Sequence, residues 1–310
     1  MITGTGGFQY EVIHDWAQTP DSLQFGNTHG VVEDSQGLIY VFHTVHATSS
    51  SADAMAVFDP GGRFVKSWGG EFRGGAHGLH LAREGSDEFL YLTDYSNAVV
   101  VKTTLDGKEL FRIGYPRQSD RYQDGRKYSP TNLALAPNGD LYIADGYGSS
   151  FVLQYDRNGN FVRTIGDAPG SEPGQLNCPH GITVDARGAE PLLLIADRTN
   201  NRLQYFTLDG KFVRIAGGVL RPCHFDQRDG VLLIPDLASR VTLLDQQNEV
   251  ITHLCEDTSG TYSDLRKQPR EKFIPGKFIC PHGACFDHEG NIFVVEWVEI
   301  GRVTKLKRIR

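Results

Sequence analysis

A six-fold internal repeat constrains this chain more than any other feature of its sequence. In the clearest copy, His180 opens an apolar stretch, a polar turn follows, and a second apolar stretch ends at Asp197. The same order recurs at a spacing of roughly 45 to 58 residues, with copies that begin at His29, His77, Thr131, His180, His224 and His282. Self-similarity at such a period is typical of proteins built from repeated supersecondary units.

Each repeat contains four short stretches of β-prone residues separated by turn residues. In the third copy these stretches are Leu133–Ala136, Leu141–Asp145, Phe151–Tyr155 and Phe161–Gly166. Short strands with evenly spaced turns indicate a sandwich, a barrel or a propeller, and a period near 45 residues selects the propeller. We therefore expect an all-β, six-bladed β-propeller of four-stranded antiparallel blades that forms one domain over residues 1–310.

The two ends of the chain predict how the last blade is completed. The sixth repeat supplies only three strands, of which the third is Val303–Lys307. The segment Phe8–Trp16 alternates as an edge strand should, and it precedes the first repeat. We expect this N-terminal strand to close the last blade, which removes the exposed edges of an open array.

Charge and composition narrow the classes of partner and compartment. The chain has 31 Lys and Arg against 38 Asp and Glu, whereas binding to nucleic acid or a membrane surface favours a basic face. No apolar run is long enough to span a bilayer, no signal peptide is visible, and five cysteines suggest no disulfide framework. We expect a cytoplasmic, reduced protein with a small-molecule substrate and neither a nucleic-acid nor a membrane partner; the oligomeric state stays open.

Five of the six copies carry a histidine at the same phase. Because the first strand of each propeller blade lines the central channel, these side chains should converge at one end of it: His29, His77, His180, His224 and His282. Neutral imidazoles that converge predict a metal site, and three of them with an open position fit catalytic zinc. The alternatives are a purely structural girdle of histidines and a mixed site with Cys178 or Cys280.

Other polar residues recur near the strand ends. An acid ends most second strands, at Asp94, Asp145, Asp197, Asp236 and Glu296. We expect these carboxylates to accept backbone N–H bonds at turns, with support of the histidines as the alternative. His43 and His46 are further candidates for the mouth of the channel.

The chain resembles the NHL-repeat six-bladed propellers and, among them, is similar to the peptidyl-α-hydroxyglycine α-amidating lyases. The resemblance is carried by His77 in Ala-His-Gly-Leu, His180 in Pro-His-Gly-Ile and His282 in Pro-His-Gly-Ala, which match the zinc ligands of that family. Tyr147 in Asp-Gly-Tyr matches its catalytic tyrosine, and Arg198 after Ala-Asp matches an arginine of its site.

This resemblance implies a divalent metal, with zinc favoured and calcium doubtful, held by His77, His180 and His282. Tyr147 is then expected to act as the base, with a pKa lowered toward neutrality by the metal and Arg198. His29 and His224 are extra in this chain. We expect both to lie just outside the ligand set, where they take a catalytic role by hydrogen bonding.

Two departures from the family pattern bear on the substrate. The family has a substrate-binding arginine after Phe-His in the first blade, and here Thr44 follows Phe42-His43. The family also places an aspartate after its third ligand, and here Gly283 stands there. We therefore expect this chain to share the scaffold and the metal of the resembling family more closely than its substrate.

The function that these features favour is a metal-dependent, lyase-like enzyme that cleaves or dehydrates a small hydroxy or carbonyl substrate. One alternative is a metal-dependent hydrolase of a lactone or ester. Such propellers typically use calcium with oxygen ligands, and a histidine-rich ring favours a softer metal. The other alternative is a non-enzymatic NHL interaction module, which the histidine-lined channel disfavours.

Overall fold

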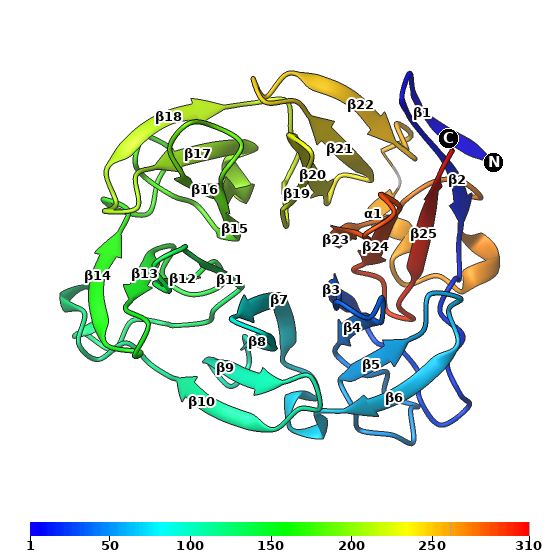
Figure 1. The fold of residues 1–310 in the computed structure, drawn as a ribbon, viewed down its shortest axis with the longest axis horizontal. Coiled ribbons are helices and arrows are strands. Elements are labelled where there is room, and N and C mark those ends of the chain that lie inside the picture. Colours follow the sequence, from blue (N-terminus) through cyan, green and yellow to red (C-terminus); the bar gives the residue numbers. More distant parts are fainter. Residues whose placement is uncertain (261, 310) are drawn as a thin grey trace. The chain divides into compact units, whose positions relative to one another are not determined.

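The computed structural model describes residues 1–260 and 262–309. They form a six-bladed β-propeller of four-stranded antiparallel sheets, as the repeat predicts, and one sheet carries an additional fifth strand (Figure 1). Contacts between Cα atoms divide the chain into two compact units. Unit 1 joins residues 1–76 to residues 225–310, and unit 2 is the continuous segment 77–224. The expectation of a single domain stays a prediction.

Unit 2 contains the second, third and fourth blades. The second is β7 (Ala76–Glu84), β8 (Asp87–Asp94), β9 (Val99–Thr104) and β10 (Glu109–Ile113). The third is β11 (Asn132–Leu135), β12 (Leu141–Ala144), β13 (Val152–Tyr155) and β14 (Phe161–Ile165). The fourth is β15 (Pro179–Asp185), β16 (Leu192–Asp197), β17 (Arg202–Phe206) and β18 (Phe212–Ala216). The strands of the third blade lie within one residue of the four stretches expected from the sequence.

Unit 1 contains the other three blades. The first is β3 (Thr28–Glu33), β4 (Ile39–His43), β5 (Met55–Phe58) and β6 (Phe64–Trp68). The fifth is β19 (Asp226–Arg228), β20 (Val231–Asp236), β21 (Arg240–Leu244) and β22 (Val250–Leu254). The sixth is β23 (Pro281–Phe286), β24 (Ile292–Glu296), β25 (Val303–Arg308), β2 (Phe8–Ile13) and the additional strand β1 (Ile2–Thr5).

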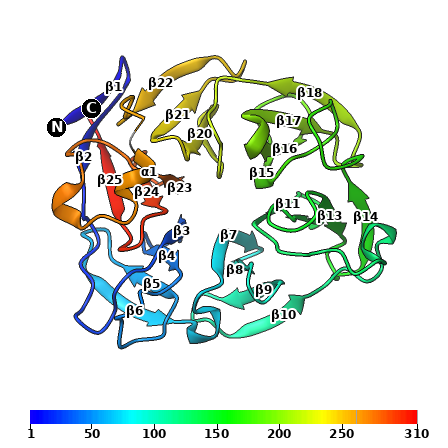
Figure 2. The ribbon, with the colours of Figure 1, turned by 180° about the vertical axis from the view of Figure 1, so that it is seen from behind.

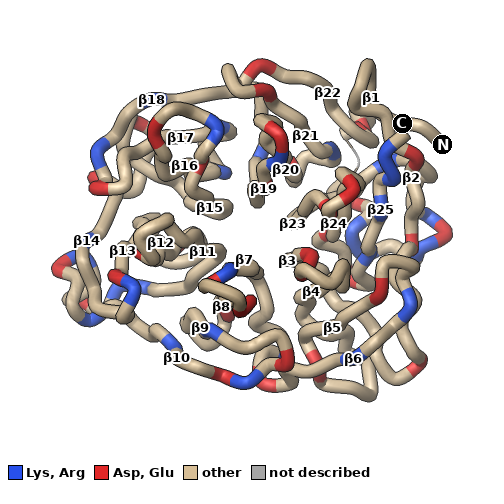
Figure 3. The backbone as a smooth tube through the Cα atoms, viewed as in Figure 1, with Lys and Arg blue, Asp and Glu red and all other residues tan. Residues whose placement is uncertain are grey.

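Helical structure among the described residues is confined to short segments in the connections. They are α1 (Tyr262–Leu265) and the 3₁₀ turns η1 (Gly70–Phe72), η2 (Asp120–Tyr122), η3 (Arg198–Asn200) and η4 (Arg270–Lys272). Among the residues that the structure describes, no helix has the length and apolar character needed to cross a membrane. Lys and Arg as well as Asp and Glu occur along the traces of both units (Figure 3), and β25 carries Lys305, Lys307 and Arg308.

The middle strands of each blade are buried on both faces, which explains their continuous apolar sequences. Every residue of β12 and β13 is buried, whereas most of β18 is exposed. In unit 2, Tyr142 and Val152 of the third blade pack in one cluster with Leu193 of the fourth. Burial of such side chains stabilises the fold by about 1.5–3 kcal/mol each relative to an exposed position. The cores of the blades therefore lie between neighbouring sheets.

An aspartate at the third hairpin of several blades fixes the turn. The carboxylate of Asp156 accepts backbone N–H bonds from Asn158 and Asn160, at 2.9 Å each. Gly159 between them has a φ of 79°, a left-handed conformation that glycine adopts without strain. The same pair of bonds recurs in unit 1 at the third hairpins that hold Asp59 and Asp245, and at Asp287 in the first hairpin of the sixth blade.

The sixth blade joins the two ends of the chain, which confirms the predicted closure. Strand β2 pairs antiparallel with β25, with Tyr10 opposite Arg308 and Val12 opposite Leu306. Tyr10 and Leu306 are fully buried in one cluster of unit 1. Strand β1 adds a further, mostly exposed strand to β2, which the sequence did not predict. The N and C labels accordingly lie beside the same sheet in both views (Figure 2).

Removal of residues 1–16 should leave a protein that is insoluble or unfolds at a much lower temperature. The deletion takes away β2 and Trp16, leaves the backbone of β25 unpaired and uncovers the buried Leu306. Removal of residues 1–5 is the matched control, because it takes only β1. The measurement is thermal unfolding of the soluble fraction. A protein without residues 1–16 that melts like the full chain would show that β2 does not hold the blade together.

Candidate active site

His77, His180 and His282 share one local arrangement. Each is buried, and each is the second residue of the first strand of its blade. Each ring Nδ1 lies against a backbone carbonyl oxygen at the start of the following blade: Thr131 at 2.6 Å, Cys223 at 2.8 Å and His29 at 3.1 Å, respectively. Because a carbonyl can only accept, Nδ1 carries the proton in all three rings. Each Nε2 therefore presents a lone pair.

The glycine after each of these histidines leaves room for the same carbonyl. A Cβ atom on Gly78 would lie 2.7 Å from the oxygen of Thr131, and one on Gly181 would lie 2.7 Å from the oxygen of Cys223. At Gly283 the oxygen of His29 would lie closer still. Glycine is thus required at these places by the close approach of a neighbouring blade. An aspartate does not fit at position 283 unless that contact opens.

Tyr147 lies between two of the histidines of unit 2. It follows β12, and its hydroxyl oxygen is 3.1 Å from Nε2 of His77 and 3.1 Å from Nε2 of His180. Arg198, which opens η3 after β16, donates from Nη1 to the same oxygen at 3.3 Å. Its Nη2 lies 3.2 Å from the sulfur of Cys178. Unit 2 therefore brings together His77, Tyr147, His180 and Arg198.

The donor set at Tyr147 suits a cation. Both Nε2 atoms present lone pairs, and one phenol hydroxyl has a single proton to donate. That proton can satisfy only one imidazole, so the second imidazole faces the phenol oxygen with no proton between them. A positive ion resolves this arrangement, and imidazole nitrogens are ligands that zinc and related metals bind. The described residues include groups of histidine and cysteine that could hold a metal ion.

Burial sets the protonation states in this cluster. Burial lowers the pKa of His77 to about 3; the hydrogen bond to the carbonyl of Thr131 opposes this shift, and the neighbouring Arg198 and His224 add to it. The imidazole is therefore neutral, which is the form that binds metals. Burial raises the pKa of Tyr147 to about 12, and Arg198 only partly opposes this effect. The protein alone thus keeps the phenol protonated at neutral pH, and a pKa near neutrality needs a further positive charge.

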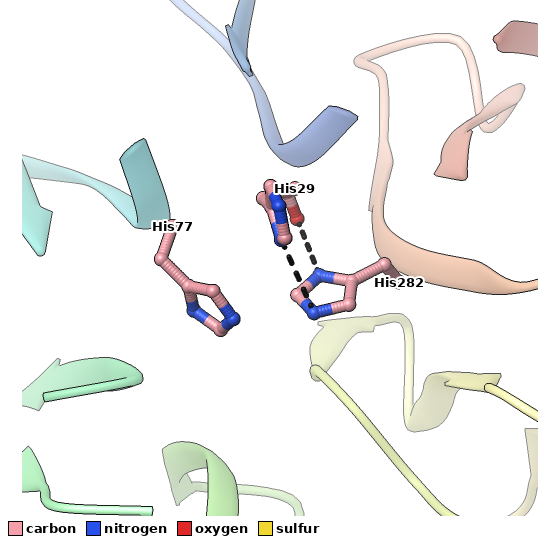
Figure 4. Close-up of side chains that lie close together, drawn as sticks. All are labelled: His29, His77 and His282. Atoms are coloured by element: carbon pink, nitrogen blue, oxygen red, sulfur yellow. Dashed lines mark hydrogen bonds between the residues drawn. The ribbon is translucent and has the colours of Figure 1, made fainter. Parts of the chain in front are cut away.

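The two remaining histidines of the repeat occupy different surroundings. In unit 1, Nδ1 of His29 lies 3.3 Å from Nε2 of His282, and the rings meet edge to face (Figure 4). His224 does not open a strand, contrary to the prediction, because β19 begins only at Asp226. Phe225 stands where the other four histidine-bearing copies have glycine, and its side chain prevents the same close approach of the backbone.

Tyr95 belongs to the cluster of unit 2 and was missed from the sequence. Its ring centroid lies 5.8 Å from those of His77 and Tyr147, edge to face in both cases. The repeat carries a signal for it, because Asp94-Tyr95 holds the same place in the second blade as Asp197-Arg198 in the fourth.

The acids that end the second strands hold turns and loops, as expected. In unit 2, Asp145 accepts backbone N–H bonds from Ser129 and Ser149, at 2.6 Å each. In unit 1, Glu296 accepts one from Ile279 at 2.7 Å and pairs with Arg302. These carboxylates are engaged with the backbone near the histidines rather than aimed at an imidazole.

His43, a candidate for the channel mouth, is buried in unit 1. Its Nδ1 accepts the backbone N–H of Val45 at 3.1 Å, and its Nε2 has no partner. His46 makes a local hydrogen bond with Thr48. Neither residue contacts His29 or His282 through a bond that the structure shows.

No family model matches the chain. Among curated proteins it is similar to peptidylglycine alpha-amidating monooxygenase of Rattus norvegicus, at 29% identity over 320 residues, which cover 94% of this chain and 31% of the relative. It is 28% identical over 216 residues to peptidyl-alpha-hydroxyglycine alpha-amidating lyase 2 of Drosophila melanogaster, covering 62% and 50%. It is 25% identical to human NHL repeat-containing protein 3, covering 64% and 57%. The chain spans only 17% of the Xenopus laevis monooxygenase A, at 32% identity over 165 residues, or 51% of this chain.

Solved structures support the fold. A streptogramin B lyase has a TM-score of 0.63 at 15% identity and covers 96% of this chain and 97% of its own. A gluconolactonase from Xanthomonas campestris has a TM-score of 0.65 at 12% identity, covering 98% and 94%. At these identities the likeness shows a shared fold and carries no function.

Replacement of Gly181 by alanine should destabilise the protein by about 1–3 kcal/mol, because the added methyl overpacks the contact with the carbonyl of Cys223. Gly188→Ala is the matched control in the same blade, since its Cβ has only one neighbour, at 3.8 Å. Its effect should stay within about 0.5 kcal/mol. The measurement is urea unfolding, and equal stabilities of the two variants would contradict the steric role of Gly181.

The stability of the protein should fall on acidification through His43. Burial lowers the pKa of His43 from 6.5 to about 3, so the unfolded chain takes up a proton below pH 6.5 that the folded chain refuses. Between pH 7 and pH 5 this costs about 2 kcal/mol of unfolding free energy. His43→Phe keeps the ring volume and should lose about that much less stability over the same interval. An unchanged pH dependence in urea unfolding would contradict this account.

Proposed function

We propose that this protein is a metal-dependent, lyase-like enzyme that cleaves or dehydrates a small hydroxy or carbonyl substrate. The observation that carries the proposal is the phenol of Tyr147 between Nε2 of His77 and Nε2 of His180, with Arg198 donating to the same oxygen. An elimination that begins with removal of a proton needs a general base, a positive charge and a metal. Here the phenol is the candidate base, the guanidinium supplies the charge, and the two imidazoles are candidate metal ligands.

His77, His180 and His282 would hold the metal. All three are buried and have the same Nδ1 bond to a backbone carbonyl, which fixes the ring and leaves Nε2 for an ion. A set of imidazole nitrogens favours zinc or a similar metal, whereas calcium prefers oxygen ligands. When bound, the metal would act as a Lewis acid toward a carbonyl or hydroxyl oxygen of the substrate.

The residues of the chain would move the proton. Tyr147 in its phenolate form would take a proton from the substrate hydroxyl, whose oxygen becomes a carbonyl as the bond to the leaving group breaks. The electron pair of that bond leaves with the departing group, which then receives the proton. Arg198 would stabilise the negative charge on the phenolate, since its guanidinium already donates to that oxygen. His224 would hydrogen-bond the substrate.

The substrate of this protein can be inferred from its relatives only in part. Their names refer to peptidyl-α-hydroxyglycine, whereas this chain has Thr44 where the resembling family has a carboxylate-binding arginine. We therefore propose a small hydroxy or carbonyl compound that need not carry a carboxylate. Release of glyoxylate from hydroxyglycine peptides should be screened beside dehydration of keto-sugars and hydrolysis of lactones, which covers the hydrolase alternative.

We also propose that the protein works in a reducing, cytoplasmic setting and not on nucleic acid or membranes. All five cysteines are buried thiols. Figure 3 shows residues of both charges along the chain, and the excess of 38 Asp and Glu over 31 Lys and Arg does not favour a polyanionic partner. A non-enzymatic interaction module would not need the cluster around Tyr147.

Alanine at position 77, 180 or 282 should abolish stoichiometric metal binding, because each variant removes one of three ligands. His253→Ala is the control, since that half-buried histidine contacts Thr242 instead. Tyr147→Phe should retain the metal and lose at least about 100-fold in turnover, the contribution typical of a general base. Metal content is measured by elemental analysis of protein purified without a histidine tag. Full metal content in the three alanine variants would refute the ligand set.

A further inference from the structure

His29 and His282 lie in unit 1 with their ring nitrogens facing each other. Nδ1 of His29 is 3.3 Å from Nε2 of His282, and the ring planes meet at 88° with centroids 4.4 Å apart (Figure 4). Both side chains are buried. The repeat phase alone names all five histidines as candidates, and the family resemblance leaves His29 outside the ligand set, as a hydrogen-bonding partner of a metal-bound water or the substrate. The contact gives it a different neighbour, namely the nitrogen that His282 offers to an ion.

The tautomer of His282 is fixed by its other bond. Its Nδ1 donates to the carbonyl oxygen of His29 at 3.1 Å, so its Nε2 has a lone pair and no proton. A direct bond between the two rings would require His29 to donate from Nδ1. At 3.3 Å between two nitrogens this is a long hydrogen bond. The contact places Nδ1 of His29 directly beside the nitrogen that His282 can offer to an ion.

The same separation fits two ligands of one ion. An ion about 2.1 Å from each of two nitrogens that lie 3.3 Å apart subtends an angle of about 104° between them. This angle lies between about 90° for octahedral and about 109° for tetrahedral coordination. The spacing of the two ring nitrogens is therefore that of two ligands bound to one ion.

The backbone of His29 is held in place for this role. Its carbonyl oxygen accepts the bond from His282 and fills the space where a Cβ on Gly283 would lie. His29 is also the second residue of β3, at an irregularity of the ladder between Thr28 and Gly30, which pair with β4. The backbone that carries its ring is thus held by the contact with His282 and by its two paired neighbours, and a preorganised ligand costs little ordering entropy when the ion binds.

We propose that His29 is a fourth protein ligand of the metal and binds through Nδ1 beside Nε2 of His282. This inference rests on the proposed metal site and changes its composition. With His29 included, the chain supplies four imidazole nitrogens. A substrate atom could then join only on an ion that accepts a fifth ligand, which favours metals of flexible coordination number over strictly four-coordinate zinc.

The test is Co²⁺ binding by the full chain, stripped with a chelator and purified without a histidine tag. His29→Phe keeps an aromatic ring against His282 and removes both nitrogens. It should raise the Kd for Co²⁺ at least about 100-fold, which exceeds the usual effect of losing a residue that only hydrogen-bonds a ligand. It should also change the visible absorption of any Co²⁺ that binds. His253→Phe in the same unit is the matched control and should change neither quantity.

The outcomes separate this inference from the proposed function. If the unaltered chain binds Co²⁺ and His29→Phe binds it with the same Kd and spectrum, His29 is not a ligand and the three-histidine proposal stands. If the unaltered chain binds no Co²⁺, both are overturned. X-ray absorption of the metal-loaded, unaltered chain gives a second measurement that is independent of how the variant folds. Four imidazoles around the ion support the inference, and three contradict it.

Discussion

The hydrogen bond from a histidine Nδ1 to the carbonyl of the next blade is the contact on which the candidate site depends. It recurs at His77, His180 and His282, and in each case the following glycine lets that carbonyl approach. One bond therefore does two things. It ties the first strand of one blade to the start of the next, and it fixes the tautomer that exposes Nε2. The same ring nitrogen and carbonyl oxygen thus stabilise the fold and orient the candidate ligand.

The buried strands around these histidines hold the groups of the site in fixed positions. Strands β12 and β16 bury nearly all of their residues; Asp145 directly follows β12, and Asp197 is the last residue of β16. Each carboxylate accepts backbone N–H groups of a loop that would otherwise be unpaired, as Asp197 does for Asn177 at 2.7 Å. The loops that present Tyr147 and Arg198 are thereby anchored on rigid strands, which is what precise positioning of a catalytic group requires.

Much of the fold and of the candidate site could be predicted from the sequence, because the repeat shows which residues occupy equivalent positions in different blades. The blades, the closure by β2 and the equivalence of His77, His180 and His282 all follow from the recurrence of short apolar stretches and turns. Tyr147 was found only through a family motif. The steric reason for Gly283 depends on a carbonyl more than 250 positions away, at His29. No local pattern carries that information. The raised pKa of Tyr147 likewise comes from burial, which the sequence around it does not reveal.

The pairing of β2 with β25 also affects the order in which the chain can fold during synthesis. Unit 2 is a continuous segment, so its three blades can assemble as soon as they leave the ribosome. Unit 1 is discontinuous, and its last sheet needs the first strand and the final one together. An early-made strand with an open apolar edge must therefore wait through the synthesis of nearly the whole polypeptide. Until then it depends on chaperones, or on its own short length, to avoid pairing with another chain.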